Sequence, residues 1–171
     1  MAMPGKLKKY ADIVGNDVID QLYQLSHLLE GIKVVHVNST RQGGGVAEIL
    51  NKLVPLMKEL DLDVSWETID GNPDFFTCTK NFHNALQGNK IETSNHLKKV
   101  YEEVNRQNAE KLKDKLIDAD IVFIHDPQPA MLLNYFPERR GKWIWRCHID
   151  VSHPHRGTWK YIRNIVRDYD A

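Results

Sequence analysis

A chain of 171 residues has the size of one ordinary domain and is long enough to bury a single hydrophobic core. Its 23 lysine and arginine residues balance its 23 aspartate and glutamate residues, so no overall electrostatic field favours nucleic acid or an anionic membrane as a partner. We expect a soluble cytoplasmic protein, because the two cysteines are far apart, no apolar signal core opens the chain, and no apolar stretch approaches the roughly 20 residues of a membrane span.

The first 30 residues predict a helical extension. Residues 1–9 are basic and lack an apolar pattern, so we expect a frayed leader there. A helix is predicted over residues 10–29, with Asn16 as a candidate cap and Gly31 just past its end. The residues that recur at helical spacing, and that we expect to form its buried stripe, are Val18, Leu22, Leu25 and Leu29.

The next segment predicts a strand, a helix and a second strand. Residues 33–37 are apolar and mostly β-branched, which is typical of a strand. Three glycines follow, and a helix opens at Val46. The apolar face of this helix consists of Val46, Ile49, Leu50, Leu53, Val54, Met57 and Leu60. Residues 64–69 predict the second strand, and a connection of this length requires a parallel crossover.

Two helices are predicted before the next strand. The first begins near Asp74 and stops at Gly88, and we expect its aromatic residues to fill the core rather than grip a ligand. Its inward residues are Phe75, Thr79, Phe82 and Leu86. The second covers residues 94–116 and buries Leu97, Val100, Tyr101, Val104, Leu112 and Leu116. Its many lysines and glutamates predict a solvated outer face.

Two further strands and two helices complete the chain. Residues 121–124 form a continuous apolar run, which is typical of a buried parallel strand. A short helix is predicted from Pro129 to about residue 135, because proline suits the first helical position. Residues 143–147 predict another strand, and residues 158–169 a last helix. One side of that helix carries Trp159, Ile162, Val166 and Tyr169.

This alternation predicts an α/β fold with a doubly wound, mostly parallel Rossmann-like sheet and an N-terminal helical extension. Ligands bind such sheets in the crevice beyond the carboxyl ends of the strands. Three strand ends carry unusual polar residues, namely residues 38–45, 125–128 and 146–150. We expect all three to face one crevice and to form a binding site there.

Gly43, Gly44 and Gly45 stand between the first strand and its helix. Backbone amides that approach closely, together with the helix N-terminus, favour an anionic or polyhydroxy ligand. A tight turn with close packing is the alternative. A dinucleotide site is the weaker rival, since its G-x-G-x-x-G pattern needs glycine or alanine where Glu48 stands, although Asp70 keeps a ribose contact open.

The other two strand ends also allow more than one interpretation. Asp126 and Gln128 are candidates for hydrogen bonds to sugar hydroxyls, whereas the alternative is that Asp126 pairs with His125 and caps the next helix. The segment Arg146-Cys147-His148-Ile149-Asp150 matches no zinc spacing, so we expect no metal. Core packing explains the tryptophans of the basic stretch 139–167 better than nucleic-acid binding does.

Six strings of residues carry a resemblance to a known family. They are residues 36–40 (HVNST), 43–50 (GGGVAEIL), 75–76 (FF), 79–89 (TKNFHNALQGN), 125–129 (HDPQP) and 145–150 (WRCHID). The sequence resembles the trehalose synthases of the glycosyltransferring type, which are retaining glycosyltransferases of family 4. The resemblance covers nearly the whole chain from about residue 10.

The resemblance implies the GT-B arrangement of two Rossmann-like halves, of which this chain is the first. It also implies transfer of glucose from a nucleoside-diphosphate glucose to free glucose, giving trehalose with retention of the donor configuration. No cofactor is implied beyond that substrate. The implied partners are the sugar and the nucleotide-sugar, with no nucleic acid and no membrane, and a homodimer is left open.

The resemblance also implies roles for particular residues. His148 matches a histidine that bonds the primary hydroxyl of the donor glucose, and it is the candidate catalytic residue. Asp126 contacts the acceptor sugar. Gly44 and Gly45 lie near the donor diphosphate and sugar. The remaining residues expected to bind substrate are Gly43, Gln128, Arg146 and Asp150.

The chain departs from the family pattern because it lacks the residues that the family's second half contributes. The family's cationic pair at the diphosphate and its two glutamates seven residues apart belong to the second half. Glu102 and Glu110 have that separation without the expected glycines, so we consider it a coincidence. We therefore expect residues 1–171 to be a single, truncated acceptor-side domain without the nucleotide-binding half, inactive alone. The alternatives are a family 4 transferase with another acceptor sugar and a non-catalytic module that binds a sugar or nucleotide.

Overall fold

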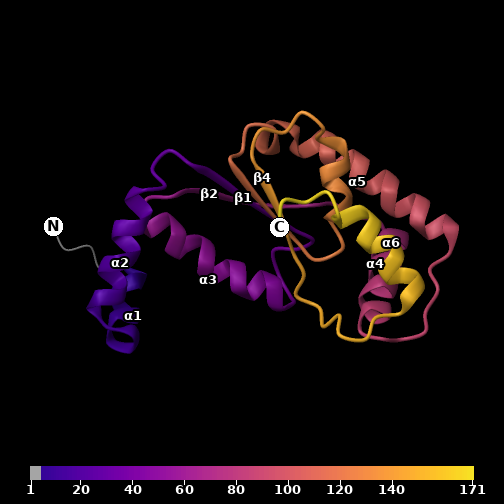
Figure 1. The fold of residues 1–171 in the computed structure, drawn as a ribbon, viewed down its shortest axis with the longest axis horizontal. Coiled ribbons are helices and arrows are strands. Elements are labelled where there is room, and N and C mark those ends of the chain that lie inside the picture. The colour runs from indigo at the N-terminus through magenta and orange to yellow at the C-terminus, as the bar shows by residue number, and fades with distance from the viewer. Residues whose placement is uncertain (1–4) are drawn as a thin grey trace.

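Four parallel strands form one sheet at the centre of the molecule (Figure 1). The computed structural model describes residues 5–171. The strands are β1 (Lys33–Asn38), β2 (Asp63–Thr68), β3 (Ile121–His125) and β4 (Lys142–Arg146). Their order across the sheet is β2-β1-β3-β4, and every neighbouring pair is parallel. The predicted α/β fold with a parallel sheet is confirmed.

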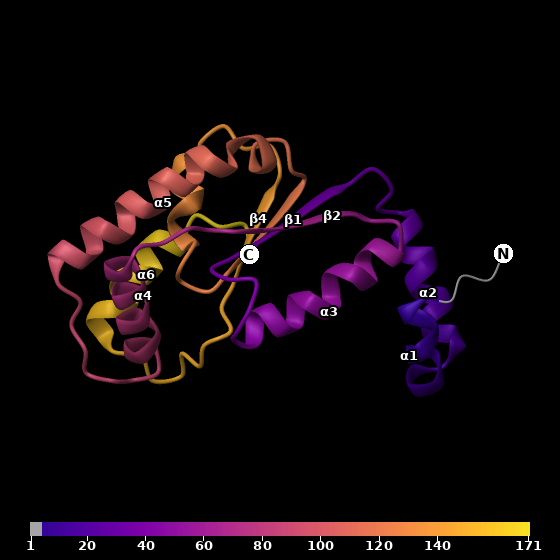
Figure 2. The same ribbon diagram turned by 180° about the vertical axis from the view of Figure 1, so that it is seen from behind.

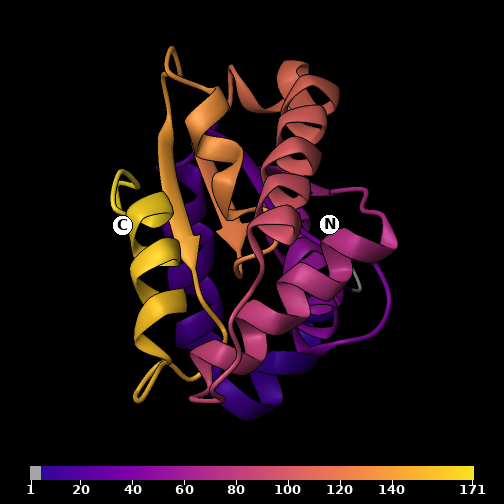
Figure 3. The same cartoon turned by 90° about the vertical axis from the view of Figure 1, so that its right-hand side faces the viewer.

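Helices cover both faces of this sheet, which makes it doubly wound. Helix α3 (Gly45–Glu59) packs on one face over a small core that contains Leu50, Val54 and Trp66. Helices α4 (Pro73–Leu86), α5 (Asn95–Leu116) and α6 (Arg156–Val166) and the 3₁₀ helix η1 (Ala130–Tyr135) share the larger core on the other face. Figure 2 shows α3 apart from α4, α5 and α6, and Figure 3 shows those three helices together.

Strand β1 is buried on both faces, because its side chains alternate between the two cores. Val35 and Val37 belong to the larger core, and Val34 belongs to the core beneath α3. His36 points to the same face as Val34 and stacks on Phe123 of β3. A polar side chain is therefore enclosed in the middle of the sheet.

The two long helices on the larger core begin at side-chain caps. Asn72 Oδ1 accepts a hydrogen bond from the Phe75 N–H at 2.8 Å, with Pro73 in the first helical position of α4. Ser94 Oγ accepts one from the Leu97 N–H at 3.3 Å at the start of α5. The two aromatic residues of α4 that were predicted to face inward pack in the core, since Phe75 and Phe82 are fully buried, whereas Phe76 is exposed.

The N-terminal extension differs from its prediction. Two helices, α1 (Lys6–Val14) and α2 (Asn16–His27), replace the single helix expected over residues 10–29. The break lies at Gly15, whose φ of 87° is left-handed and cannot continue a helix. Asn16 is the first helical residue rather than the cap. The predicted leader is helical from Lys6, and its first four residues lie outside the described part of the chain.

The predicted buried stripe of this extension is also wrong. Val18, Leu25 and Leu29 are exposed, and Leu22 is only half-buried. The residues that α1 and α2 bury are Leu7, Ile19 and Ser26, because these helices lie at the end of the molecule away from α4, α5 and α6 (Figures 1 and 2). Within residues 5–171, no helix is both long and apolar enough to cross a membrane.

Three smaller differences concern the second half of the chain. The segment after β3 forms a 3₁₀ helix, with Pro129 as its cap rather than its first residue. Strand β4 spans residues 142–146 instead of 143–147. Helix α6 spans residues 156–166, so Tyr169 follows it and donates from its hydroxyl to the Ala130 carbonyl at 2.7 Å.

Candidate functional site

A cavity of about 210 Å³ opens at the carboxyl ends of β1 and β3. These neighbouring strands mark the point where the chain connections diverge, since β1 leads to β2 on one side and β3 leads to β4 on the other. Sheets of this class bind ligands at such a point. Two of the three expected strand ends, residues 38–45 and 125–128, contribute to the walls, whereas residues 146–150 do not line the cavity.

The glycine loop forms one wall of the cavity. Gly43 and Gly44 have φ angles of 75° and 84°, which strongly favour glycine. A Cβ on Gly43, Gly44 or Gly45 would meet no atom within 4 Å, so the space in front of the loop is open. Helix α3 begins at Gly45 without a side-chain cap, and its first amides are available to a ligand. The positive φ angles of the turn account for glycine at positions 43 and 44. The open space in front of the loop also leaves room for the predicted contact between its backbone amides and a ligand.

The loop before the glycines is anchored by Asn38. Its Nδ2 donates to the Thr40 carbonyl at 2.8 Å, and its Oδ1 accepts from the Trp66 Nε1–H at 2.8 Å. Arg41 lies over the Trp66 ring, 4.5 Å from its centre. These contacts fix the position of the polar residues that leave β1. This anchor could not be predicted from the sequence beyond the polar character of the strand end.

Asp126 has a left-handed backbone, with a φ of 64°, directly after β3. Its N–H donates to the Arg146 carbonyl at 2.9 Å, and its carbonyl accepts from the Trp145 Nε1–H at 3.0 Å. Its Oδ1 accepts from the His148 N–H at 2.6 Å. Helix η1 has no side-chain cap, so the alternative in which Asp126 caps the next helix is wrong. Burial raises the pKa of this carboxyl group.

A row of three histidines lies beside Asp126. His36 Nδ1 and His125 Nε2 are 3.0 Å apart, and His125 Nδ1 and His148 Nε2 are 2.9 Å apart. The rings of neighbouring histidines meet edge to edge, with interplanar angles of 26° and 27°. Phe123 stacks on His36, and its ring centre also lies 6.5 Å from that of His125. The predicted catalytic residue, His148, is therefore hydrogen-bonded to a side chain that lines the cavity.

Burial lowers the pKa of the two inner histidines. The pKa of His36 falls to about 4 through desolvation alone. That of His125 falls to about 3 through desolvation, with further lowering by His36, His148 and Arg146. Both imidazoles are neutral near pH 7, so they act as hydrogen-bonding groups rather than as cations.

The other predicted site residues have different positions. Gln128 lines the cavity, and its carbonyl accepts from Asn105 Nδ2 at 3.1 Å. Arg146 is exposed at the end of β4. Asp150 is exposed, and its Oδ1 accepts from the N–H and hydroxyl of Ser152, which lower the pKa of its carboxyl group. The cavity thus brings together Gly43, Gly44, Gly45, Asp126 and Gln128, whereas His148 contacts two lining residues, His125 and Asp126, without lining the cavity itself.

Two histidines near the cavity were missed in the sequence. His83 of α4 lines the cavity, and His36 is bonded to His125. His83 lies in one of the strings that carry the family resemblance, which was the available signal for it. His36 opens another of those strings, but it lies inside an apolar strand and resembles an ordinary core residue.

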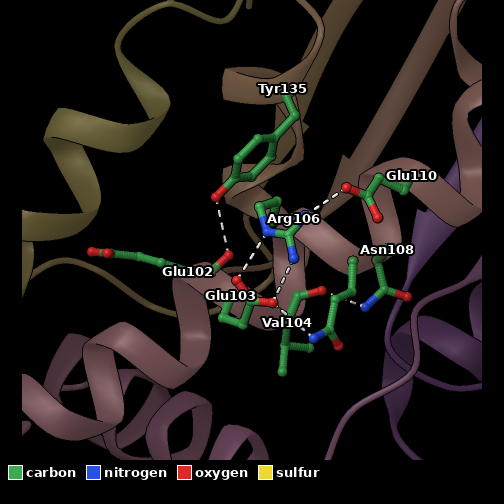
Figure 4. A network of polar contacts seen from close by, with 8 residues as sticks. Glu102, Glu103, Val104, Arg106, Asn108, Glu110 and Tyr135 are labelled. Atoms are coloured by element: carbon green, nitrogen blue, oxygen red, sulfur yellow. Dashed lines mark hydrogen bonds and ion pairs between the residues drawn. The ribbon is translucent and has the colours of Figure 1, made fainter.

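Glu102 and Glu110 lie away from the cavity, on α5 (Figure 4). Glu110 accepts a hydrogen bond from Arg106 at 2.5 Å, and the Glu102 carbonyl accepts one from the Tyr135 hydroxyl at 3.0 Å. Arg106 also pairs with Glu103 at 2.7 Å on this exposed face. The predicted solvated face of the helix is confirmed. Among residues 5–171, no group of three histidine, cysteine, aspartate or glutamate side chains is arranged to hold a metal ion.

Comparison with known proteins gives one family across most of the chain. Residues 36–171 match the family described as trehalose synthase, N-terminal domain. The chain is 47% identical over 166 residues to the trehalose synthase of Thermococcus litoralis, which covers 96% of this chain and 40% of that protein. It is 45% identical over 168 residues to that of Rubrobacter xylanophilus, with the same coverage.

A second group of relatives is more distant. The trehalose phosphorylase of Pleurotus pulmonarius is 29% identical over 184 aligned residues, which cover 94% of this chain and 24% of that protein. The chain spans about two fifths of the length of the trehalose synthases it matches. The match over residues 36–171 and the identity along nearly the whole chain place it in one family: the chain belongs to the trehalose synthase N-terminal domain family.

Proposed function

We propose that this chain is the acceptor-side half of a retaining transferase, which moves glucose from a nucleoside-diphosphate glucose to free glucose and forms trehalose. The carrying observation is the cavity at the divergence of β1 and β3, where the uncapped start of α3 faces Asp126 and Gln128. Family membership supports the same proposed function, since the trehalose synthases named above are similar to this chain along 96% of its length.

The residues of the cavity suit the charges that such a transfer develops. Breaking a glycosyl phosphate bond gives the sugar oxocarbenium character and leaves negative charge on the diphosphate. The amides of Gly44 and Gly45 at the start of α3 provide partial positive charge for the leaving group. Asp126 and Gln128 provide acceptors and donors for sugar hydroxyls. His148, bonded to His125, is proposed to contact the donor glucose.

In this proposal, lysine or arginine side chains of a second, nucleotide-binding half contact the diphosphate. The chain alone is then inactive in glucose transfer. None of the described residues that line the cavity is lysine or arginine. A diphosphate leaving group needs such cations in addition to backbone amides. In the trehalose synthases named above, about three fifths of the length lies outside the part similar to this chain, which leaves room for a nucleotide-binding half.

A phosphorylase is the second candidate, because the chain also resembles trehalose phosphorylases at 28–29% identity. A phosphate group fits the same uncapped helix start as a diphosphate does. The chain would then serve an enzyme that cleaves trehalose with inorganic phosphate. A transferase with another acceptor sugar and a separate sugar-binding module are the remaining alternatives.

A chimaeric enzyme tests the proposal. This chain replaces the corresponding two fifths of the Thermococcus litoralis protein, and trehalose formation from nucleotide-glucose and glucose is measured. We expect activity from the chimaera and none from the 171-residue chain alone. A chimaera that acts only on trehalose with inorganic phosphate would favour the phosphorylase.

Binding by the chain itself provides the second arm of this test. Glucose, trehalose and nucleotide-glucose are titrated separately into the labelled chain and followed by NMR. We expect weak sugar binding with shifts at residues 125–128 and 43–45. Tight binding of the nucleotide by this chain alone contradicts the assignment of nucleotide contacts to another half.

A further inference from the structure

The three histidines form a continuous row from the centre of the sheet to the half-buried His148, and the middle one, His125, lines the cavity. His36 and His125 are each 3% exposed, whereas His148 is half-buried. Each contact joins a ring Nδ1 to a ring Nε2, at 3.0 Å and 2.9 Å. At the buried end His36 Nε2 has no hydrogen-bond partner among residues 5–171. At the other end His148 Nδ1 has none within the same part of the chain.

The protons of such a row are coupled. A neutral imidazole has one N–H and one bare nitrogen, so His125 donates to one neighbour and accepts from the other. Both hydrogen bonds therefore run in the same direction. In one direction every ring is protonated at Nδ1, and in the other every ring is protonated at Nε2. The tautomer of His148 is thus tied to that of His36.

Both ends of the row favour protonation at Nδ1. The opposite direction would leave the His36 Nε2–H buried without an acceptor, and unpaired buried N–H groups are rarer than unpaired acceptors. At the other end, Asp126 Oδ1 lies 2.6 Å from the His148 backbone nitrogen. Within a histidine, Nδ1 is the ring nitrogen nearer the backbone. The carboxylate therefore favours a proton on His148 Nδ1 over a bare lone pair there.

We infer that His36 and His125 are positioning residues, which hold His148 as the neutral Nδ1–H tautomer and make it a hydrogen-bond donor. The row donates outward, from His36 Nδ1 to His125 Nε2 and from His125 Nδ1 to His148 Nε2. The acceptor for the free His148 N–H is a sugar hydroxyl, and this last clause rests on the proposed function. A structural role for His36 alone would not fix the tautomer of a residue that it does not touch.

Nitrogen NMR on the 171-residue chain tests the row without any activity assay. The chain is labelled with ¹⁵N-histidine, and the protonated nitrogen of each ring is assigned at pH 8. We expect His36, His125 and His148 to carry their protons on Nδ1. In His36→Phe, which keeps an aromatic ring on Phe123 but removes the donor, His148 changes to a mixture of tautomers.

Three further variants make the result decisive. His36→Asn places an amide near the position of Nδ1 and restores a single His148 tautomer. His125→Phe cuts the row at its centre and releases His148 even where His36→Phe fails to fold. His96→Phe, at an exposed site on α5, leaves His148 unchanged. A wild-type His148 protonated at Nε2, or a single Nδ1–H tautomer retained in the folded His36→Phe or His125→Phe chain, overturns the inference.

Glucose added to the same samples separates this inference from the proposed function. A shift of the His148 Nδ1 signal on titration supports the sugar contact. If glucose and nucleotide-glucose leave that signal unchanged while the tautomers are as expected, the proposed contact between His148 and the sugar is wrong. The inference that His36 and His125 hold the His148 tautomer is then still supported.

Discussion

Three residues around the cavity have a left-handed backbone, namely Gly43, Gly44 and Asp126. Glycine adopts this conformation freely, whereas for aspartate it has a cost of about 1 kcal/mol. At Asp126 the hydrogen bonds from His148 and to Arg146 offset this cost. The strained residue is thus one whose carboxylate is held at the cavity, which is a common arrangement at functional sites.

Replacing Gly44 and Gly45 one at a time measures the backbone strain at Gly44, because an added Cβ meets no other atom at either position. Gly44→Ala forces a Cβ into a φ of 84°, and we expect it to lower the free energy of unfolding by about 1–2 kcal/mol. Gly45→Ala is the matched control, because Gly45 has no positive φ and its Cβ would also meet open space. Urea unfolding measures both changes. Equal losses in the two variants would contradict the strain argument.

His148→Ala in the chimaera tests the proposed donor-sugar contact. We expect turnover to fall roughly 100-fold, the scale reported for losing one hydrogen-bond donor to a reacting group. Nucleotide affinity should change little, because the residue is proposed to touch the sugar. His153→Ala, at a nearby exposed position, is the control. An unchanged rate removes His148 from the site.

The sequence indicated part of this site and missed the rest for physical reasons. Gly43–Gly45, Asp126 and Gln128 follow buried strands, so parallel topology was enough to place them together. Asp150 was also grouped with them, but a short turn with Ser152 engages its carboxylate. The role of His36 was missed, because alternation along a strand predicts which face of the sheet a side chain points to. It does not predict which residue of a neighbouring strand that side chain contacts, and here the contact is His125.

At the scale of elements, a side chain of α3 holds the first turn of α1. The Glu59 carboxylate accepts from the Lys6 N–H at 2.7 Å and from the Leu7 N–H at 3.0 Å. A carboxylate at a helix N-terminus satisfies free amides and complements the helix dipole. The N-terminal extension also leaves apolar side chains uncovered, since Ile13 of α1 is 79% exposed and Leu28, directly after α2, is 78% exposed.

Glu59→Ala should loosen α1 without disturbing the sheet. We expect hydrogen exchange to accelerate at the amides of α1, corresponding to about 1 kcal/mol of lost local stability, while the β1 amides remain protected. Glu59→Gln keeps one acceptor oxygen and should show an intermediate effect. Glu48→Ala, at an exposed position on the same helix, is the control. Uniform acceleration across the molecule would show that α1 is not attached independently.

The elements were predicted best where burial is greatest. β1 and β3 lie at the centre of the sheet and are mostly buried, so their apolar runs identified them to within one residue. The helix break at Gly15 was missed, because a lone glycine within a helical pattern is usually tolerated. The apolar spacing on α2 does not specify burial, since a helix at the end of the molecule meets few neighbours.

At the scale of the whole molecule, the sheet has neutral imidazoles at its centre where apolar residues usually lie. His36 and His125 are buried between β1, β3 and the start of α3, and the folded state holds them unprotonated. The unfolded chain protonates histidine near pH 6.5. Folding is therefore linked to the release of protons in mildly acidic solution.

Acidification should destabilise the protein before its carboxylates titrate. The folded pKa values are about 4 for His36 and about 3 for His125, so the unfolded state binds more protons below pH 6.5. The free energy of unfolding is constant above pH 6.5 and declines as the pH falls toward 4. We expect a loss of about 1–2 kcal/mol per histidine between pH 6.5 and 5.

Urea unfolding across this pH range measures the slope. His36→Phe should flatten it, whereas the exposed His96→Phe should not. The raised pKa of Asp126 acts in the opposite direction at lower pH, because protonation there relieves a buried charge. A stability that does not change between pH 7 and 5 would contradict the burial of neutral histidines.

The hydrogen bond between the Trp66 indole and Asn38 gives the protein an optical reporter. Asn38 lines the cavity, and Arg41 covers the Trp66 ring, so we expect a ligand in the cavity to alter the surroundings of this fluorophore. The other three tryptophans, Trp143, Trp145 and Trp159, pack on the opposite face of the sheet. Replacing those three with phenylalanine leaves a single emitter, whose fluorescence intensity follows the ordering of the loop after β1 in real time.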